Sequence, residues 1–116
     1  MGAHLRGSPV MLLRTTGRRT GLRRETPVLY FPEGSGCAIV ASNGGAAHHP
    51  AWFLNLERDP SVEAQMGGAI QAMRARPTRG EERERLWQLV TDQFPGYLHY
   101  QVRTSREIPV VMLEPA

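Results

Sequence analysis

The first 42 residues alternate short apolar runs with turns that contain glycine or proline, and this spacing constrains the fold more than any other feature. Residues 10–16, 23–31 and 37–42 are predicted strands, and the turns over 17–21 and 32–36 supply glycines for tight reversals. Because such short connections join antiparallel strands, the three segments predict a meander. Pro27 lies within the second strand and cannot donate to a sheet ladder, which predicts an edge position or a bulge.

The middle of the chain predicts a short helix followed by a hairpin. Pro50 suits the first turn of a helix that carries Trp52 on its apolar stripe, and Asp59-Pro60 ends that helix. Gly67-Gly68 then separates two further strands, over 62–66 and 70–76, in the manner of a hairpin turn.

The last third predicts a longer helix and a final strand. Thr78 and Glu81 have the spacing of a capping box, and Pro95-Gly96 ends the helix that they open. Its apolar face is predicted at Leu86, Leu89, Val90 and Phe94, and its solvated face at Glu81, Glu82, Arg83 and Arg85. With a strand over 108–113, six short strands and two or three helices predict a mainly β chain whose antiparallel sheet curls into a small barrel. We expect one domain over residues 9–116, after a flexible terminus at residues 1–8.

Positive charge gathers at the start of the chain. Residues 1–24 hold six arginines and no acidic residue, whereas the remaining eight arginines are accompanied by eleven acidic residues. This asymmetry predicts that the N-terminal part meets an anionic group. Arginine suits that task because its guanidinium binds phosphate or carboxylate through two parallel hydrogen bonds.

Several classes of protein are disfavoured by composition. No apolar run approaches the roughly 18 residues of a membrane span, and residues 1–7 lack the apolar stretch of a signal peptide, so we expect a cytoplasmic protein. Cys37 is the only cysteine, which excludes an internal disulfide and a cysteine zinc site. His48-His49 lacks the i, i+4 spacing of a helical zinc motif, so no metal is expected.

Two further features are compatible with a binding site. Ser42-Asn-Gly-Gly45 presents bare backbone before a helix, which fits either a ligand-binding loop or an ordinary strand-to-helix connection. Phe94, Tyr97 and Tyr100 are spaced by three residues along one helical face, which fits either core packing or the wall of an apolar pocket.

Four blocks of sequence carry a resemblance to a known family. They are Thr15-Thr-Gly-Arg-Arg-Thr-Gly21, Thr26-Pro-Val-Leu-Tyr30, Val40-Ala-Ser-Asn-Gly-Gly45 and His49-Pro-Ala-Trp-Phe-Leu-Asn-Leu56. Two further stretches, Glu81-Glu-Arg83 and Arg106-Glu-Ile-Pro-Val-Val111, continue the match. Together they resemble the deazaflavin-dependent nitroreductase family of actinobacteria, over residues 9–115. The resemblance implies a split β-barrel of the FMN-binding type, adapted to coenzyme F420, a deazaflavin hydride carrier.

The resemblance also implies roles for single residues. The phosphate and oligoglutamate tail of F420 would be held by Arg18, Arg19, Thr20 and Arg24. The ring and its linking chain would be lined by Pro27, Ala41, Ser42, Asn43, Trp52 and Asn55. The substrate pocket would be formed by Leu29, Ser42, Phe94, Tyr97 and Tyr100. Members that activate nitroimidazoles carry tyrosine at the positions of Leu29 and Phe94, so this chain departs from them there.

The function expected on this basis is hydride transfer from reduced F420 to a hydrophobic acceptor such as a quinone, with nitro compounds as side substrates. Ser42 would be the catalytic residue, because it can hydrogen-bond the acceptor as negative charge develops. Peripheral contact with a membrane and a monomeric or homodimeric state are both compatible with this hypothesis.

Two alternatives stay open at this point. A split barrel can use FMN or FAD instead of F420. A small basic module could bind nucleic acid through residues 6–24, but that segment contains no aromatic side chain on which bases would stack, so no nucleic-acid partner is expected.

Overall fold

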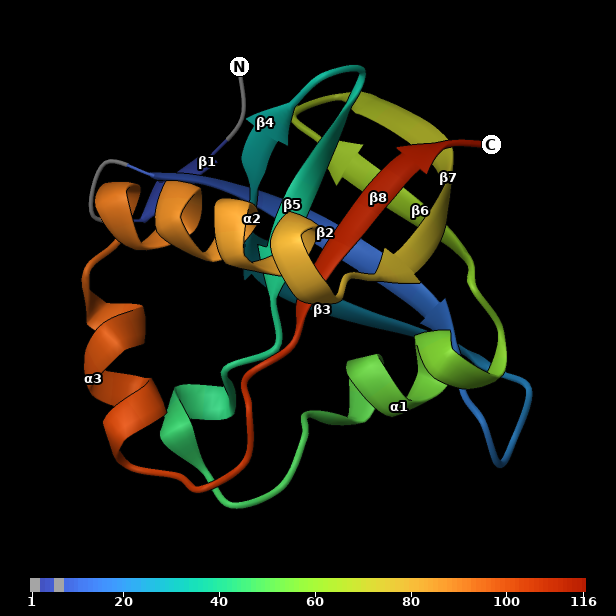
Figure 1. The fold of residues 1–116 in the computed structure, drawn as a ribbon. Coiled ribbons are helices and arrows are strands. Elements are labelled where there is room, and N and C mark those ends of the chain that lie inside the picture. The colour runs from blue at the N-terminus through green and yellow to red at the C-terminus, as the bar shows by residue number, and fades with distance from the viewer. Residues whose placement is uncertain (1–2, 6–7) are drawn as a thin grey trace.

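A computed structural model describes residues 3–5 and 8–116 of the chain, with side chains from residue 9 onward. Eight strands, three α-helices and one 3-10 turn make up this part of the chain (Figure 1). In chain order they are β1 (Ala3–Leu5), β2 (Ser8–Thr16), β3 (Arg23–Leu29), β4 (Phe31–Glu33), β5 (Gly36–Val40), η1 (Asn43–Gly45), α1 (Ala51–Arg58), β6 (Ser61–Met66), β7 (Ala69–Pro77), α2 (Gly80–Gln93), α3 (Gly96–Val102) and β8 (Val110–Pro115).

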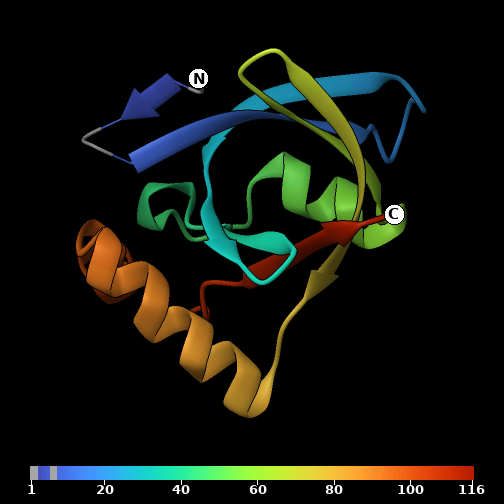
Figure 2. The same cartoon turned by 90° about the horizontal axis from the view of Figure 1, so that it is seen from above.

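The strands form one antiparallel sheet that curls on itself, as the barrel prediction requires. Its order is β1-β2-β6-β7-β8-β5-β4, and β3 pairs with β2 beside this path. Seen from above, the strands wrap round while α2 lies along one side of the curl (Figure 2). No helix of the described residues combines the length and the apolar character needed to cross a membrane.

The predicted meander is wrong in its long-range pairing. The segment expected as one strand over 23–31 divides at Tyr30 into β3 and β4. β3 pairs with β2, and β5 pairs with β4 and β8, so β3 and β5 are not neighbours in the sheet. The reason is burial: Cys37, Ala38, Ile39 and Val40 of β5 are all buried, and a strand covered on both faces belongs inside a sheet. β3 is largely exposed and forms an edge, which confirms the prediction from Pro27.

Alternate residues of β5 and β8 divide the core into two clusters. Ile39 and Val111 belong to the cluster that α1 covers, together with Phe53 and Leu56. Val40 and Val110 face the other way, into a cluster shared with side chains of α2 and α3. The sheet is therefore packed on both faces. The chain that leaves β5 passes through η1, beside α3, and then enters α1 (Figure 1).

Local predictions in the middle of the chain are confirmed. Pro50 immediately precedes α1, whose last residue is followed by Asp59. Gly67-Gly68 joins β6 to β7 in a hairpin. At the N-terminus, β1 pairs with the beginning of β2, and residues 1, 2, 6 and 7 lie outside the described residues, so the predicted flexibility of residues 1–8 stays a prediction there.

Two predictions for α2 are wrong. The capping box does not form: Arg79 precedes the helix without a side-chain cap, and the Thr78 hydroxyl donates instead to the carbonyl of Val110, at 2.8 Å. Arg83, expected on the solvated face, is buried. Its Nη2 donates to the carbonyl of Ile108 at 2.7 Å, and its guanidinium lies 4.7 Å from the centroid of the Trp87 ring. The hydrogen bond to Ile108 ties α2 to the segment that precedes β8, which a local pattern of polar residues does not reveal.

Candidate functional site

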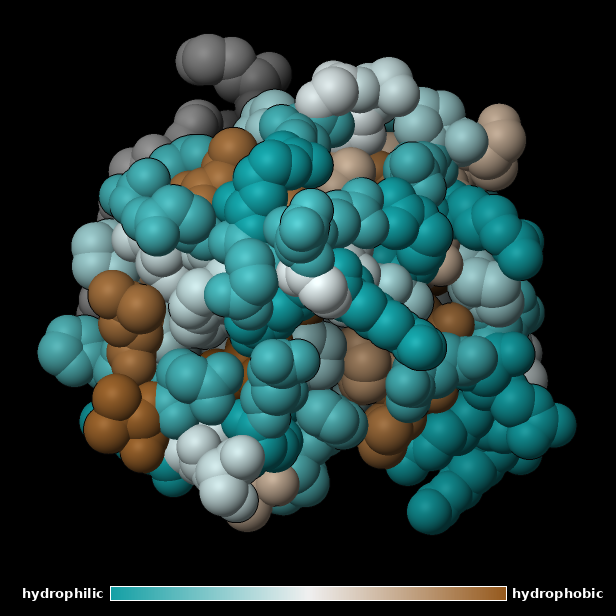
Figure 3. Space-filling view, in the orientation of Figure 1, coloured by the Kyte–Doolittle hydropathy of each residue, from teal (hydrophilic) through white to brown (hydrophobic). Residues whose placement is uncertain are grey.

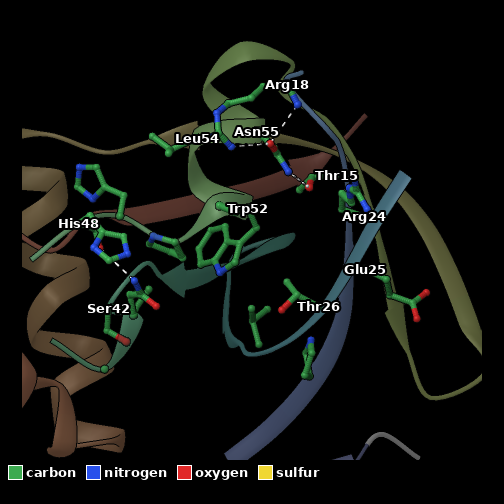
Figure 4. Close-up of a pocket in the computed structure, with 18 of the residues that line it drawn as sticks. Thr15, Arg18, Arg24, Glu25, Thr26, Ser42, His48, Trp52, Leu54 and Asn55 are labelled. Carbon is green, nitrogen blue, oxygen red and sulfur yellow. Dashed lines mark hydrogen bonds between the residues drawn. The ribbon is translucent and has the colours of Figure 1, made fainter. Parts of the chain in front are cut away.

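One cleft of about 1010 Å³ opens between the edge strand β3, the loop over residues 42–50, the start of α1 and the ends of α2 and α3 (Figure 4). A volume of this order is sufficient for a cofactor-sized ligand. Of the residues predicted for a site, all but Ala41 line the cleft: Arg18, Arg19, Thr20, Arg24, Pro27, Leu29, Ser42, Asn43, Trp52, Asn55, Phe94, Tyr97 and Tyr100.

The turn between β2 and β3 brings three guanidinium groups to one end of the cleft, which we call the arginine end. Gly17 N donates to Leu22 O at 2.7 Å and Gly21 N to Gly17 O at 2.8 Å, so the turn is closed by its own backbone. Within residues 9–116, no carboxylate pairs with Arg18, Arg19 or Arg24. The three cations are therefore available to an anionic ligand.

Asn55 supports this turn from beneath. Its side chain is only 4% exposed. Asn55 Oδ1 accepts hydrogen bonds from the backbone N of Arg18 at 3.1 Å and from Arg18 Nη1 at 3.4 Å, and Nδ2 donates to Thr15 Oγ1 at 3.1 Å (Figure 4). Asn55 also lines the cleft, so its predicted contact with the cofactor stays a prediction, and its hydrogen bonds in addition hold Arg18 in place. Thr15 was not predicted from the sequence.

The loop after β5 exposes bare backbone to the cleft. Asn43, Gly44 and Gly45 have φ angles of 48°, 62° and 82°. A Cβ at Gly45 would lie 2.7 Å from the carbonyl oxygen of Tyr100, so this glycine permits close packing against α3. A Cβ at Gly44, which lines the cleft, would meet nothing within 4 Å. The loop thus connects a strand to a helix through close packing at Gly45 and also exposes backbone to the cleft at Gly44. The ligand-binding loop and the ordinary connection, both compatible with the sequence, are therefore not exclusive.

Aromatic side chains form the other end of the cleft, which we call the aromatic end. Phe94 and Tyr97 are buried, with ring centroids 4.8 Å apart, and Tyr100 lies 6.2 Å from Tyr97. Burial raises the pKa of the Tyr97 phenol above its usual range, so this hydroxyl stays protonated. Leu29 packs against the same cluster. These residues are at once core and wall.

Trp52 and Ala41 differ in how they relate to the cleft. Trp52 is half-buried, packs against the first core cluster and also lines the cleft (Figure 4). Ala41 is buried, and its backbone N donates to the carbonyl of Pro109 at 3.0 Å. It supports the floor of the site and does not line it.

His48 and His49 of the loop also line the cleft, and neither was predicted as a site residue. The signal that could have found them is their place between Ser42 and the start of α1, two elements that the resemblance had already assigned to the site. Within the described residues, no group of three His, Cys, Asp or Glu side chains lies close enough to hold a metal ion.

Comparison with known proteins gives consistent results. The family described as F420H(2)-dependent quinone reductase matches residues 1–115. An F420H(2)-dependent quinone reductase of Mycobacterium tuberculosis is 41% identical over 108 residues, which cover 90% of this chain and 72% of the relative. The solved structure of an F420-H2 dependent reductase, FDR-A, is 39% identical and superposes with a TM-score of 0.83, covering 97% of this chain and all of the other. A second structure, described as a domain-swapped dimer, is also 39% identical, with a TM-score of 0.84 over 91% of this chain and 80% of the other. The sheet is therefore the split β-barrel that the sequence predicted.

Proposed function

The chain belongs to the F420H(2)-dependent quinone reductase family, and we propose that it transfers a hydride from reduced F420 to a hydrophobic quinone. The observation that carries this proposal is the polarity of the cleft: unpaired guanidinium groups at one end, aromatic side chains at the other, and an exposed loop backbone between them. A long ligand with an anionic tail and a flat ring matches that order.

The residues of the cleft fit such a cofactor. Arg18, Arg19 and Arg24 have no carboxylate partner within residues 9–116, so they keep their charge for a phosphate and for glutamates. Gly44 has no side chain and a clear space in front of it, where a ring edge can approach the backbone closely. Trp52 and Pro27 also line the cleft and supply flat apolar surfaces.

In this proposal Arg18, Arg19, Thr20 and Arg24 hold the tail, and Pro27, Asn43 and Trp52 hold the ring. When bound, reduced F420 supplies the hydride. The chain orients the acceptor and keeps water away from it. The hydroxyl of Ser42 makes no hydrogen bond within residues 9–116 and lines the cleft, so it is free to donate to an acceptor oxygen on which charge develops.

The aromatic end selects the acceptor. Leu29 and Phe94 offer no hydroxyl, and the phenol of Tyr97 stays neutral because its pKa is raised by burial. An apolar wall of this kind discriminates weakly between hydrophobic substrates of similar size, by about 1–3 kcal/mol per methylene-sized difference. We expect turnover of several hydrophobic quinones and little turnover of nitroimidazoles.

We also propose a peripheral contact with the membrane that holds such quinones. Leu98 and Val102 of α3 are 49% and 86% exposed, one helical turn apart, and Figure 3 shows hydrophobic side chains gathered over this helix. Co-sedimentation with lipid vesicles, compared between wild type and Val102→Ser, tests this contact.

A dimer in solution is supported by the solved structure described as a domain-swapped dimer, and light scattering measures the oligomeric state.

The enzymatic proposal is tested by the absorbance of the deazaflavin during its oxidation, with a menadione-type quinone and a nitroimidazole in parallel. Turnover of the quinone well above that of the nitroimidazole is expected. Efficient turnover of the nitroimidazole and none of the quinone would contradict the assignment of the acceptor. A purified protein that retains FMN or FAD, and binds it more tightly than F420, would favour a flavin enzyme instead.

A further inference from the structure

Arg106 braces the loop that carries Ser42. It lies between α3 and β8, and its guanidinium reaches back across the molecule to residues 41–49. Nη2 donates to the carbonyl of Ser42 at 2.7 Å, Nη1 to the carbonyl of Ala41 at 3.2 Å, and Nε to the carbonyl of Ala46 at 2.9 Å. Nη1 also lies 2.9 Å from Nδ1 of His49.

The contact with His49 fixes the proton on its imidazole ring. A guanidinium has only donors, so Nδ1 of His49 accepts this hydrogen bond and carries no proton. The proton of the neutral ring is then on Nε2. Burial and the nearby charge of Arg106 both lower the pKa of His49, while Glu57 opposes them weakly. The ring also packs against Phe53, with centroids 4.8 Å apart, so its orientation is held as well.

The opposite side of the same ring is available to a ligand. His49 lines the cleft, and within residues 9–116 no hydrogen bond engages its Nε2. Pro50, Ala51 and Trp52 follow it in the chain and also line the cleft, and Arg106 links it to Ser42. The donor is therefore part of the same wall as the proposed catalytic hydroxyl. The tautomer is therefore set by the protein before any ligand enters.

We propose that His49 is a hydrogen-bond donor, through Nε2–H, to a carbonyl oxygen of a ring bound in the cleft, and that Arg106 is the positioning residue that orients it. The assignment of that ring rests on the proposed function: the carbonyl belongs either to the deazaflavin or to the quinone. When the quinone receives the hydride, two electrons arrive on it and negative charge grows on its oxygen, where such a donor stabilises it.

His49 donates this hydrogen bond without giving up its proton. Release of the proton from Nε2 of a neutral ring would leave an imidazolate beside the cleft, which the pKa of imidazole makes unfavourable at neutral pH. The proton that completes the hydroquinone is taken from solvent, and the quinone is reduced by the hydride while F420 is oxidised. His49 thus acts as a fixed dipole rather than as a general acid.

The ligand-free protein tests the tautomer directly. In ¹⁵N-edited spectra of the imidazole rings recorded at about pH 8, where the ring is neutral, His49 should show a proton on Nε2 and none on Nδ1. Arg106→Gln should shift the midpoint of the His49 titration upward and mix the two tautomers, because it removes the guanidinium that faces Nδ1. A proton on Nδ1 in the wild type would overturn the proposal whatever the enzyme reduces.

Two replacements of His49 test the donor. His49→Asn can still accept from Arg106 but places nothing at the position of Nε2, whereas the longer His49→Gln brings an amide N–H to that position. We expect His49→Asn to lower kcat/KM for the quinone by about tenfold or more and His49→Gln to stay within about threefold of wild type. Circular dichroism and thermal melting check that both variants fold.

The equilibrium Kd for F420 then identifies the carbonyl. A higher Kd in His49→Asn assigns the hydrogen bond from His49 to the deazaflavin. An unchanged Kd with a lower kcat assigns it to the quinone. A folded His49→Asn variant that binds F420 and reduces the quinone like the wild type would overturn the proposal. If the wild type itself reduces no quinone, the proposed function fails, and the tautomer measurement and the Kd for F420 still decide the role of His49.

Discussion

The two ends of the cleft are built from different parts of the fold. At the arginine end, Arg19 and Arg24 are exposed on a hairpin turn and belong to neither core cluster. At the aromatic end, Phe94 and Tyr97 are buried members of the second cluster, which packs α2 and α3 against the sheet. The difference implies that ligand affinity is separable from folding at the first end, whereas shape and stability are coupled at the second.

The largest expected effect is therefore a loss of stability at the aromatic end. Tyr97→Ala removes a buried ring that contacts Phe31, Phe94 and Tyr100, so the free energy of unfolding should fall by about 3–5 kcal/mol. Urea denaturation measures it, and Tyr97→Phe, which keeps the ring, is the matched control. If the free energy of unfolding of Tyr97→Ala equals that of the wild type, the aromatic end lines the cleft without stabilising the fold. The two ends would then not differ in their coupling to stability.

The next effect concerns binding at the arginine end. Replacement of both Arg18 and Arg19 by alanine removes two charged contacts, each worth about 1.5–3 kcal/mol, so the Kd for F420 should rise at least tenfold. At the exposed Arg19 the free energy of unfolding should change by less than about 0.5 kcal/mol, because surface substitutions rarely cost more. Arg23→Ala is the control, since Arg23 lies on the same hairpin but pairs with Glu63 at 3.6 Å. If the double variant and the wild type bind F420 with equal affinity, the anionic tail of F420 does not bind at the arginine end.

Asn55 is the residue of the arginine end at which affinity and stability should not be separable. Because its buried amide holds Arg18 in place, Asn55→Ala should lower both stability, by about 1–3 kcal/mol, and affinity for F420. Thr15→Val removes only the partner of Nδ2 and should cost stability with little change in affinity. Denaturation measures the stability of both variants, and equilibrium titration measures their affinity for F420. If Thr15→Val loses as much affinity as Asn55→Ala, the effect of Asn55 on binding does not act through Arg18.

The smallest effect is a change of acceptor. Leu29→Tyr combined with Phe94→Tyr adds two hydroxyls at the aromatic end, each worth about 0.5–1.5 kcal/mol when hydrogen-bonded to a substrate. Turnover of nitroimidazoles should rise by a few-fold while the Kd for F420 stays constant. Because Phe94 is buried, the single Leu29→Tyr variant serves as a check on folding. A rise in the Kd for F420 instead would show that the two ends are not independent.

The features that follow from neighbours in sequence could be predicted, and those that depend on distant partners could not. The hairpin at Gly67-Gly68 and the limits of α1 are set locally, and both were predicted. The pairing of β5 with β8 brings together residues about 70 positions apart, and no turn signal encodes it. The interpretation of Arg83 failed for a related reason, because a polar residue on a helix can be buried when a distant carbonyl accepts from it.

The candidate site divides in the same way. The cluster of arginines and the aromatic spacing were visible in the sequence. Arg18, Arg19 and Arg24 of that cluster line the cleft, as do the three spaced aromatic residues. The hydrogen bonds that support the site were not visible: Asn55, although predicted as a site residue, contacts Arg18 across 37 residues, and Arg106 contacts Ser42 across 64. Such residues act through hydrogen bonds that only the folded chain forms, so their roles require the structure.

The central claim is that the cleft binds F420 with its anionic tail on the arginine end. The most direct measurement is an equilibrium titration of the wild type with intact F420 and with a truncated deazaflavin that lacks the phosphate and glutamates, at low and high salt. The account predicts that intact F420 binds at least about tenfold more tightly at low salt, and that the advantage shrinks as salt screens the arginines. Equal affinity for the two ligands, or tighter binding of FMN than of F420, would contradict it.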